Sequence, residues 1–137
     1  FSEGEIIPKK YTCDSQDVNP PLKWENPPEG TKSFALIVDD PDAPNGTWIH
    51  WLVCDIPQNE RKIKENAVPG GANQVKNDFK KVEYGGPCPP GGTHRYFFKL
   101  FALDVKKLKR AKQSNFYDLV EKHGIEKAQL MGKYTRS

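Results

Sequence analysis

The chain has 137 residues, 36% of them hydrophobic, and a formal net charge of +3 at pH 7. This length fits a single domain, residues 1–137, with a core that needs neither disulfides nor a metal. The charge is too small to indicate a nucleic-acid-binding protein, and no apolar run approaches the roughly 20 residues of a membrane span.

The first ninety residues contain short apolar segments separated by loops rich in proline and glycine. Segments of this length are typical of strands rather than helices. The pattern predicts strands at 34–39, 47–56, 78–84 and 94–103, and shorter strands near 6–11 and at the C-terminus.

Only the last quarter of the chain shows helical spacing, carried by Phe116, Leu119, Val120 and His123. Ser114 fits the N-cap and Gly124 the C-terminal stop of this first helix. A second short helix is predicted at about 125–131, ending at Gly132. Because strands and helices do not alternate, the sequence indicates a mainly β protein, an antiparallel β-sandwich with a few short C-terminal helices.

Alternate residues of a strand face opposite sides of a sheet, which assigns the histidines to faces. In TWIHWLVCDI, this parity groups His50 with Trp48, Leu52 and Cys54. In HRYFFKLFAL, it groups His94 with Tyr96 and turns Arg95 to the other face. Arg95 is therefore interpreted as a structural residue, with Asp42 as a candidate partner.

Two rigid loops run into these strands, DDPDAPNG before His50 and GGPCPPGG before His94. If the strand ends are neighbours, polar side chains converge on one cavity rimmed by prolines and Trp48: Asp40 or Asp42, His50, His94 and Tyr96. The simpler alternative is that both histidines are structural and that DPDAP is an ordinary turn.

The three cysteines, Cys13, Cys54 and Cys88, include no C-x-x-C pair. Their odd number favours free thiols and a reducing, cytoplasmic location, although one bridge plus one free thiol also fits. Cys88 is interpreted as a packed, passive thiol. The start at Phe1 leaves a removed leader open.

The basic cluster of the sequence is Lys106, Lys107, Lys109, Arg110 and Lys112. It has no interleaved aromatic residues on which bases could stack. It is therefore interpreted as a solvated helical turn and not as a nucleic-acid site.

The pairing of DDPDAP and WIHW with YGGPCPPGGTHRYFF resembles the phosphatidylethanolamine-binding protein family, also called the Raf kinase inhibitor protein family. YTCDSQDVNPPLKW and QLMGKY extend the resemblance, which points to the compact bacterial and archaeal branch. The resemblance implies a β-sandwich with an anion pocket that holds phosphate, phosphorylethanolamine, acetate or cacodylate. By motif, it assigns to that pocket Asp40, Pro44, Trp48, His50, Gly86, Pro89, His94 and Tyr96.

From these residues we expect non-catalytic binding of a small anion or phosphomonoester, with no metal and no cofactor. Asp40 would hold one histidine protonated while the other donates a neutral N–H. The Tyr96 hydroxyl and backbone N–H groups of residues 86–88 would complete the donors. Two alternatives stay open: a kinase or protease inhibitor acting through its surface, and a hydrolase or metal-dependent enzyme using His50, His94 and Asp40. Compact relatives suggest a homodimer.

Overall fold

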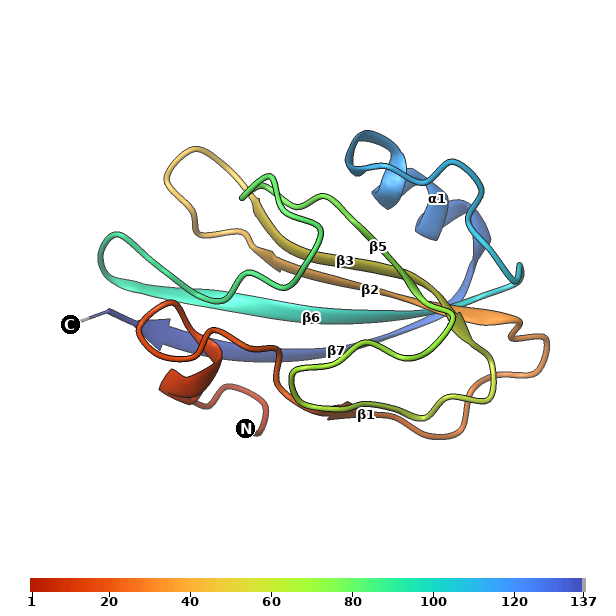
Figure 1. The fold of residues 1–137 in the computed structure, drawn as a ribbon, viewed down its shortest axis with the longest axis horizontal. Helices are drawn as coiled ribbons and strands as arrows, with labels where there is room; N and C mark the ends of the chain where they lie inside the picture. The colour runs from red at the N-terminus through yellow and green to blue at the C-terminus, as the bar shows by residue number, and fades with distance from the viewer. Residues whose placement is uncertain (137) are drawn as a thin grey trace.

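The computed structural model describes residues 1–136, which fold around a five-stranded antiparallel sheet in the order β5-β3-β2-β6-β7 (Figure 1). Its strands are β2 (Ser33–Asp40), β3 (Trp48–Pro57), β5 (Asn73–Val75), β6 (Thr93–Leu103) and β7 (Gly124–Thr135). A second sheet pairs β1 (Leu22–Lys23) with β4 (Lys62–Ile63). The predicted mainly β, antiparallel class is confirmed.

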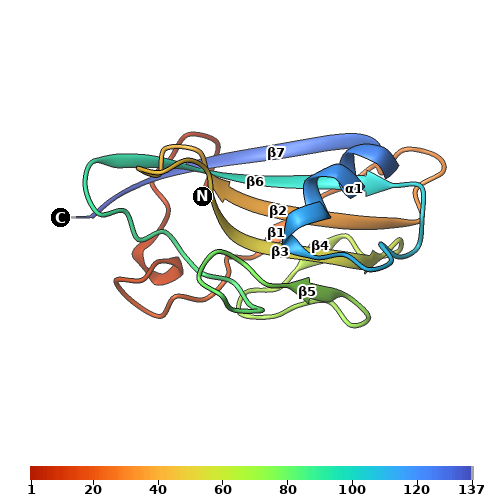
Figure 2. The ribbon, with the colours of Figure 1, turned by 90° about the horizontal axis from the view of Figure 1, so that it is seen from above.

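The large sheet buries apolar side chains on both faces, which explains why all eight residues of β2 are buried. Phe34, Leu36 and Val38 join a core cluster that also includes Ile7 and Ile63, on the side of the N-terminal segment and the small sheet. On the opposite face, Ile37 belongs to a second core cluster with Phe116 and Val120. These two residues come from the helix that covers this face of the sheet in Figure 2. The sheet is therefore the middle layer of the protein.

The helix α1 (Phe116–His123) follows a 3-10 turn, η2 (Gln113–Asn115). It buries Phe116 and Val120, four residues apart on one face. The N-cap is Asn115, so the prediction of Ser114 is wrong by one residue. Gly124 follows the helix, where a Cβ atom would lie 2.5 Å from the Val120 carbonyl oxygen. No helix within residues 1–136 combines the length and apolar character needed to cross a membrane.

The second predicted helix, at 125–131, is wrong because this segment belongs to β7. Its residues favour helix when considered alone. They pair instead with β6, from Glu126 opposite Ala102 to Met131 opposite Phe97. This pairing satisfies backbone groups that β6 would otherwise leave open at the sheet edge, and it outweighs local preference.

The predicted strand at 78–84 is also wrong, because the buried side chain of Asn77 organises this segment into a turn. The Asn77 amide donates to the carbonyl oxygens of His50 (3.0 Å) and Glu83 (2.7 Å). Its Oδ1 accepts the backbone N–H groups of Phe79 and Lys81. An asparagine that bonds neighbouring backbone competes with sheet pairing.

Two shorter predictions also change. Near residues 6–11, only a single bridge between Ile6 and Lys133 and the 3-10 turn η1 (Lys9–Tyr11) form. Pro8 cannot donate a ladder hydrogen bond, which works against a strand there. The basic segment 106–112 is irregular rather than helical, and Arg110 within it has a φ of 57°.

Candidate functional site

A pocket of about 230 Å³ opens at the end of the sheet where β2 ends and β3 and β6 begin. The loops 41–47 and 85–92 flank it, at the left of Figure 1. The structure brings most of the predicted residues together here, since the lining includes Asp40, Pro44, Trp48, His50, Pro89, His94 and Tyr96. The predicted residues of the lining thus come from two loops and three strand ends.

Gly86 is the predicted residue that the structure does not place in the lining. Its backbone N–H donates to Asp17 Oδ1 at 2.8 Å, and the Tyr11 carbonyl oxygen occupies the space that a Cβ atom would need. The next residue, Pro87, has no N–H to offer. The expectation that Gly86 donates to a ligand is therefore wrong: this glycine packs the loop against the N-terminal segment.

His94 is held by Asp40, and both side chains are buried. The His94 Nδ1 atom lies 2.7 Å from Asp40 Oδ2. The other carboxylate oxygen of Asp40 accepts the backbone N–H of Asp42 at 2.7 Å. Because an ionised carboxylate only accepts, Nδ1 carries a hydrogen, and His94 can donate from Nε2 only as the imidazolium.

His50 reaches the pocket through a β-bulge in β3. Val38 pairs with Trp51, but Asp39 pairs with Ile49, so His50 is the extra residue of its strand. The bulge breaks the alternation of faces, which places Trp51 in the core cluster on the side of Tyr96 and leaves Leu52 in the cluster under α1. The predicted grouping of His50 with Leu52 and Cys54 is therefore wrong. Bulges often re-aim a side chain next to a functional site.

The buried ring of His50 is fixed by the backbone. Its Nδ1 lies 2.7 Å from the Gly85 carbonyl oxygen, which can only accept, so Nδ1 is the donor. Burial lowers the pKa of His50, although the hydrogen bond to Gly85 opposes the shift. In its neutral form His50 thus presents an unprotonated Nε2. The expectation that a neutral histidine donates to the ligand does not fit this bond, because the one hydrogen is already used.

Tyr96 stands between the two histidines on the pocket wall. Its ring centroid lies 5.3 Å from that of His50, edge to face, and 6.4 Å from that of His94, nearly parallel. The side chain is 1% exposed, and its buried hydroxyl forms no well-aligned hydrogen bond with residues 1–136, although the Asp40 carboxylate and the Cys88 backbone N–H lie near it. Burial, followed by the nearby Asp40 charge, raises the pKa of Tyr96, so the hydroxyl keeps its hydrogen. A buried hydroxyl without a partner lowers stability.

Arg95 turns away from the pocket and holds the acidic loop. Its Nε and NH2 atoms donate to the two carboxylate oxygens of Asp42 at 2.9 and 2.8 Å. The guanidinium also lies over the Phe97 ring, 5.5 Å from the centroid. These hydrogen bonds lower the pKa of Asp42 to about 2. The pair fixes the loop that follows Asp40.

The other loop is tied down by a disulfide between Cys13 and Cys88. The prediction of free thiols is wrong for this pair, and the inference of a reducing compartment from free thiols no longer holds. The two cysteines are 75 residues apart, so no local spacing could have revealed the bond. Cys88 lines the pocket, and the bridge makes it unable to act as a nucleophile. Cys54 is free and buried, which raises its pKa to about 12.

Phe79 is a pocket residue that the sequence analysis missed. Its ring contacts those of Trp48 and His50, with centroids 5.6 and 5.2 Å away. Trp48 and Phe79 remain 39% and 37% exposed, so they form an apolar rim at the mouth. Asn77, missed as well, positions both Phe79 and the backbone of His50. The adjacent polar pair Asn77 and Asp78 is a turn signal that could have indicated this loop.

The protonatable groups of the site do not form a metal cluster. Across residues 1–136, no three His, Cys, Asp or Glu side chains lie close enough together to hold a metal ion. What the pocket offers instead is one donor, the Tyr96 hydroxyl, and two histidine Nε2 atoms that bond no other described residue. This set can exchange hydrogen bonds with a small polar ligand.

Known proteins are similar to this chain over nearly its whole length. The family model described as phosphatidylethanolamine-binding protein matches residues 1–135. A UPF0098 protein of Aquifex aeolicus is 50% identical over 145 residues, covering 99% of this chain and 85% of that protein. A UPF0098 protein of Methanothermobacter thermautotrophicus is 43% identical, covering 99% of this chain and 95% of that protein.

Two solved structures share the fold. Escherichia coli YbcL, described as a new member of the mammalian PEBP family, has a TM-score of 0.93 at 32% identity, covering 99% of this chain and 94% of its own. A phosphatidylethanolamine-binding protein homologue from Chlamydia trachomatis has a TM-score of 0.91 at 37% identity, covering 100% and 94%. The chain therefore belongs to the phosphatidylethanolamine-binding protein family, in its bacterial and archaeal UPF0098 branch.

Proposed function

We propose that the pocket binds a small anion, above all phosphate or a phosphomonoester, without reacting with it. The observation that carries this proposal is the buried, unpartnered hydroxyl of Tyr96 between two buried histidines. Buried polar groups nearly always have partners, and one that lacks a protein partner is suited to a ligand. The name of the matched family model also associates such proteins with a phosphorylated head group.

Asp40 makes an anion acceptable in this pocket through His94. An imidazolium at His94 balances the Asp40 carboxylate, and its Nε2–H is then free to donate to a ligand oxygen. A hydrogen bond between charged groups contributes about 1.5–3 kcal/mol, more than a neutral one. Anion binding should therefore depend on the Nε2–H of His94.

His50 adds a requirement for the ligand. Because its hydrogen is used by Gly85, the neutral ring can only accept at Nε2. A ligand that carries its own hydrogen, such as the P–OH of a phosphate monoanion, satisfies this nitrogen, whereas a fully ionised oxyanion does not. The pocket volume of about 230 Å³ is sufficient for a phosphoryl group with a short substituent.

The residues that line the pocket favour binding without turnover. The lining contains no serine or threonine, and Cys88 is bonded to Cys13. No serine, threonine or free cysteine nucleophile is therefore available in the lining. Release of phosphate from p-nitrophenyl phosphate that disappears in the variant His94→Gln would contradict this part of the proposal.

Titration calorimetry with phosphate and phosphorylethanolamine tests the function. His94→Gln should weaken binding by about 10-fold or more, because a charge-assisted hydrogen bond is lost. His123→Gln is the matched control, since His123 lies outside the pocket and should leave the affinity unchanged. Wild-type affinity for phosphate should fall between about pH 6 and about pH 8.5, because the ligand loses the P–OH hydrogen that neutral His50 accepts. Equal affinities in all these comparisons would overturn the proposal.

Sulfate provides a second test, because it resembles phosphate but carries no hydrogen at these pH values. With neutral His50 as an acceptor, phosphate at about pH 6 should bind about 10-fold or more tightly than sulfate. Replacing His50 with Gln, whose amide can also donate, should reduce this preference. Equal binding of the two anions by the wild type would show that His50 does not accept from the ligand.

A further inference from the structure

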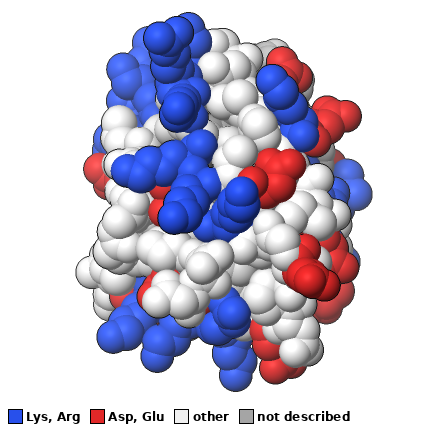
Figure 3. Space-filling view, turned by 90° about the vertical axis from the view of Figure 1, so that its right-hand side faces the viewer, with Lys and Arg blue, Asp and Glu red and all other residues white. Residues whose placement is uncertain are grey.

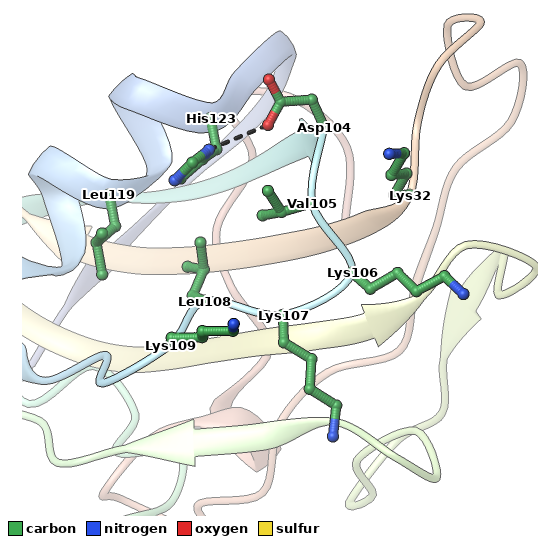
Figure 4. Close-up of a pocket in the computed structure, with 9 residues that line it drawn as sticks. All are labelled: Lys32, Asp104, Val105, Lys106, Lys107, Leu108, Lys109, Leu119 and His123. Atoms are coloured by element: carbon green, nitrogen blue, oxygen red, sulfur yellow. Dashed lines mark hydrogen bonds and ion pairs between the residues drawn. The ribbon is translucent and has the colours of Figure 1, made fainter.

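A second hollow, of about 610 Å³, lies at the other end of the sheet, where β6 ends and the connection to α1 begins. Residues 104–109 form one wall, and Lys32, Leu119 and His123 complete the lining (Figure 4). Figure 3 faces this end of the molecule and shows lysine and arginine side chains gathered across it. We call this feature the basic groove.

The positive charge of the basic groove is not neutralised from within. Lys32, Lys106, Lys107 and Lys109 are exposed, and none of the four forms an ion pair with another residue in 1–136. The one carboxylate in the lining, Asp104, lies 3.1 Å from His123 Nδ1, as the dashed line in Figure 4 shows. Lysines gathered around a concave surface produce a local positive potential that attracts anionic groups.

The floor of the basic groove is apolar. The side chains of Val105 and Leu108, from the connection, and of Leu119, from α1, lie in the space between these two elements (Figure 4). The side chains of Lys106 and Lys107 extend away from this space. Leu108 is only 5% exposed, so the apolar surface is recessed below the charged rim. An occupant therefore has to combine negative charge with an apolar group that reaches inward.

The backbone around the basic groove is held in place by hydrogen bonds to buried parts of the fold. The Leu108 N–H donates to Asp55 Oδ1 at 2.8 Å, and the Ser33 hydroxyl donates to the Val105 carbonyl oxygen at 2.5 Å. The Asp104 N–H donates to the His123 carbonyl oxygen at 3.0 Å. A pre-formed surface loses less entropy on binding than a disordered loop.

We propose that the basic groove binds an acidic peptide segment of a partner protein, with an apolar side chain of that segment seated on Leu108 and Leu119. The charge complementarity favours an acidic partner, and the recessed floor favours a narrow chain that can enter the hollow. A flat bilayer cannot reach a floor that lies below its lysine rim. Single-stranded nucleic acid is less suited, since no aromatic residue lines the groove for base stacking.

The basic groove is separate from the anion pocket. The pocket lies beside the start of β6, at His94, and the groove lies beyond its end, at Asp104. A strand of this length spans roughly 35 Å. The two sites can thus be occupied together, so failure of one proposal leaves the other standing.

The experiment is a calorimetric titration with a peptide of glutamates around a central leucine, at about 20 mM salt. The variant Lys107→Glu/Lys109→Glu should weaken binding by about 10-fold. The matched control, Lys9→Glu/Lys81→Glu, makes the same charge change on exposed lysines away from the groove and should bind like the wild type. Peptides with serine for leucine or with glutamine for glutamate should bind more weakly. At constant ionic strength, phosphate that saturates the anion pocket should change none of these affinities.

Three results would overturn the proposal. The first is no peptide binding by the wild type, and the second is an equal loss of affinity in both double variants. The third is binding of phosphatidylglycerol vesicles or of a single-stranded oligonucleotide that depends on Lys107 and Lys109 more strongly than peptide binding does.

Discussion

At the pocket end of the sheet, Asp40, His50, His94 and Tyr96 are all less than a tenth exposed, whereas the lysines at the opposite end are exposed. The buried polar groups lose their hydrogen bonds to water. The two histidines and Asp40 form hydrogen bonds with fixed protein groups instead, whereas the Tyr96 hydroxyl does not. The exposed lysines keep their hydration and act through a field that salt screens. From this difference we infer that the pocket selects its ligand by short-range geometry, whereas the basic groove attracts its partner by long-range charge.

The largest expected effect on stability comes from the Cys13–Cys88 disulfide at the pocket end of the sheet. The variant Cys13→Ser/Cys88→Ser should lose up to about 4 kcal/mol of unfolding free energy, because the bridge closes a long loop of chain. It should also weaken phosphate binding, since Cys88 lines the pocket. Urea denaturation and calorimetry measure both quantities. Peptide binding at the basic groove should be unchanged. If the variant lost both phosphate binding and peptide binding, the two sites would not be independent.

Gly86→Ala should cost about 1–3 kcal/mol of unfolding free energy, because the added methyl group overlaps the Tyr11 carbonyl oxygen and the Asp17 carboxylate. Gly91→Ala is the matched control in the same loop, where nothing lies within 4 Å of the Cβ position. Denaturation curves of the two variants separate close packing from a general effect of losing glycine. Similar midpoints for the two would contradict the packing role given to Gly86.

Part of the pH dependence of stability should also originate at the pocket end. Burial lowers the pKa of His50, so the unfolded chain binds a proton more readily, and stability should decline as the pH falls below about 6.5. Arg95 lowers the pKa of Asp42 to about 2. The stability that this ion pair contributes is therefore fully present above about pH 3.9 and is lost as the pH falls toward 2.

Denaturation midpoints measured across both pH ranges test these two assignments separately. His50→Gln should flatten the decline just below about pH 6.5 by at most about 1.4 kcal/mol per pH unit. Asp42→Asn should change only the range below about pH 4. If both variants kept the wild-type profile, the titrating groups would lie elsewhere in the molecule.

The sequence predicted the site where strand parity and loop composition were sufficient. In β6 the alternation is unbroken, so His94 and Tyr96 share the pocket face while Arg95 turns to Asp42. In β3 the bulge at His50 interrupts the alternation. The bulge depends on how β3 pairs with β2, and the local sequence of β3 does not indicate that pairing. His50 Nδ1 donates to the carbonyl oxygen of Gly85, which is 35 positions away in the sequence. This bond decides that Nε2 of the neutral ring accepts.

The fold class followed from the short apolar segments, but two elements did not. The segment 125–131 is composed of helix formers, and only its pairing with β6 makes it a strand. The Cys13–Cys88 bond joins positions that come together only in the folded chain. The basic residues 106–112 were visible in the sequence, whereas the apolar floor beneath them required the packing of α1.

We infer that Tyr96 is kept buried and unpartnered for a ligand rather than for stability, and the variant Tyr96→Phe tests this role. Unfolding free energies of wild type and variant should be measured with and without saturating phosphate. Without phosphate, the variant should be at least as stable as the wild type, because no hydrogen bond is lost. With phosphate, the wild type should gain more stability, since it binds more tightly. If the variant were less stable without phosphate and gained as much stability from phosphate as the wild type, the Tyr96 hydroxyl would serve stability and not ligand binding.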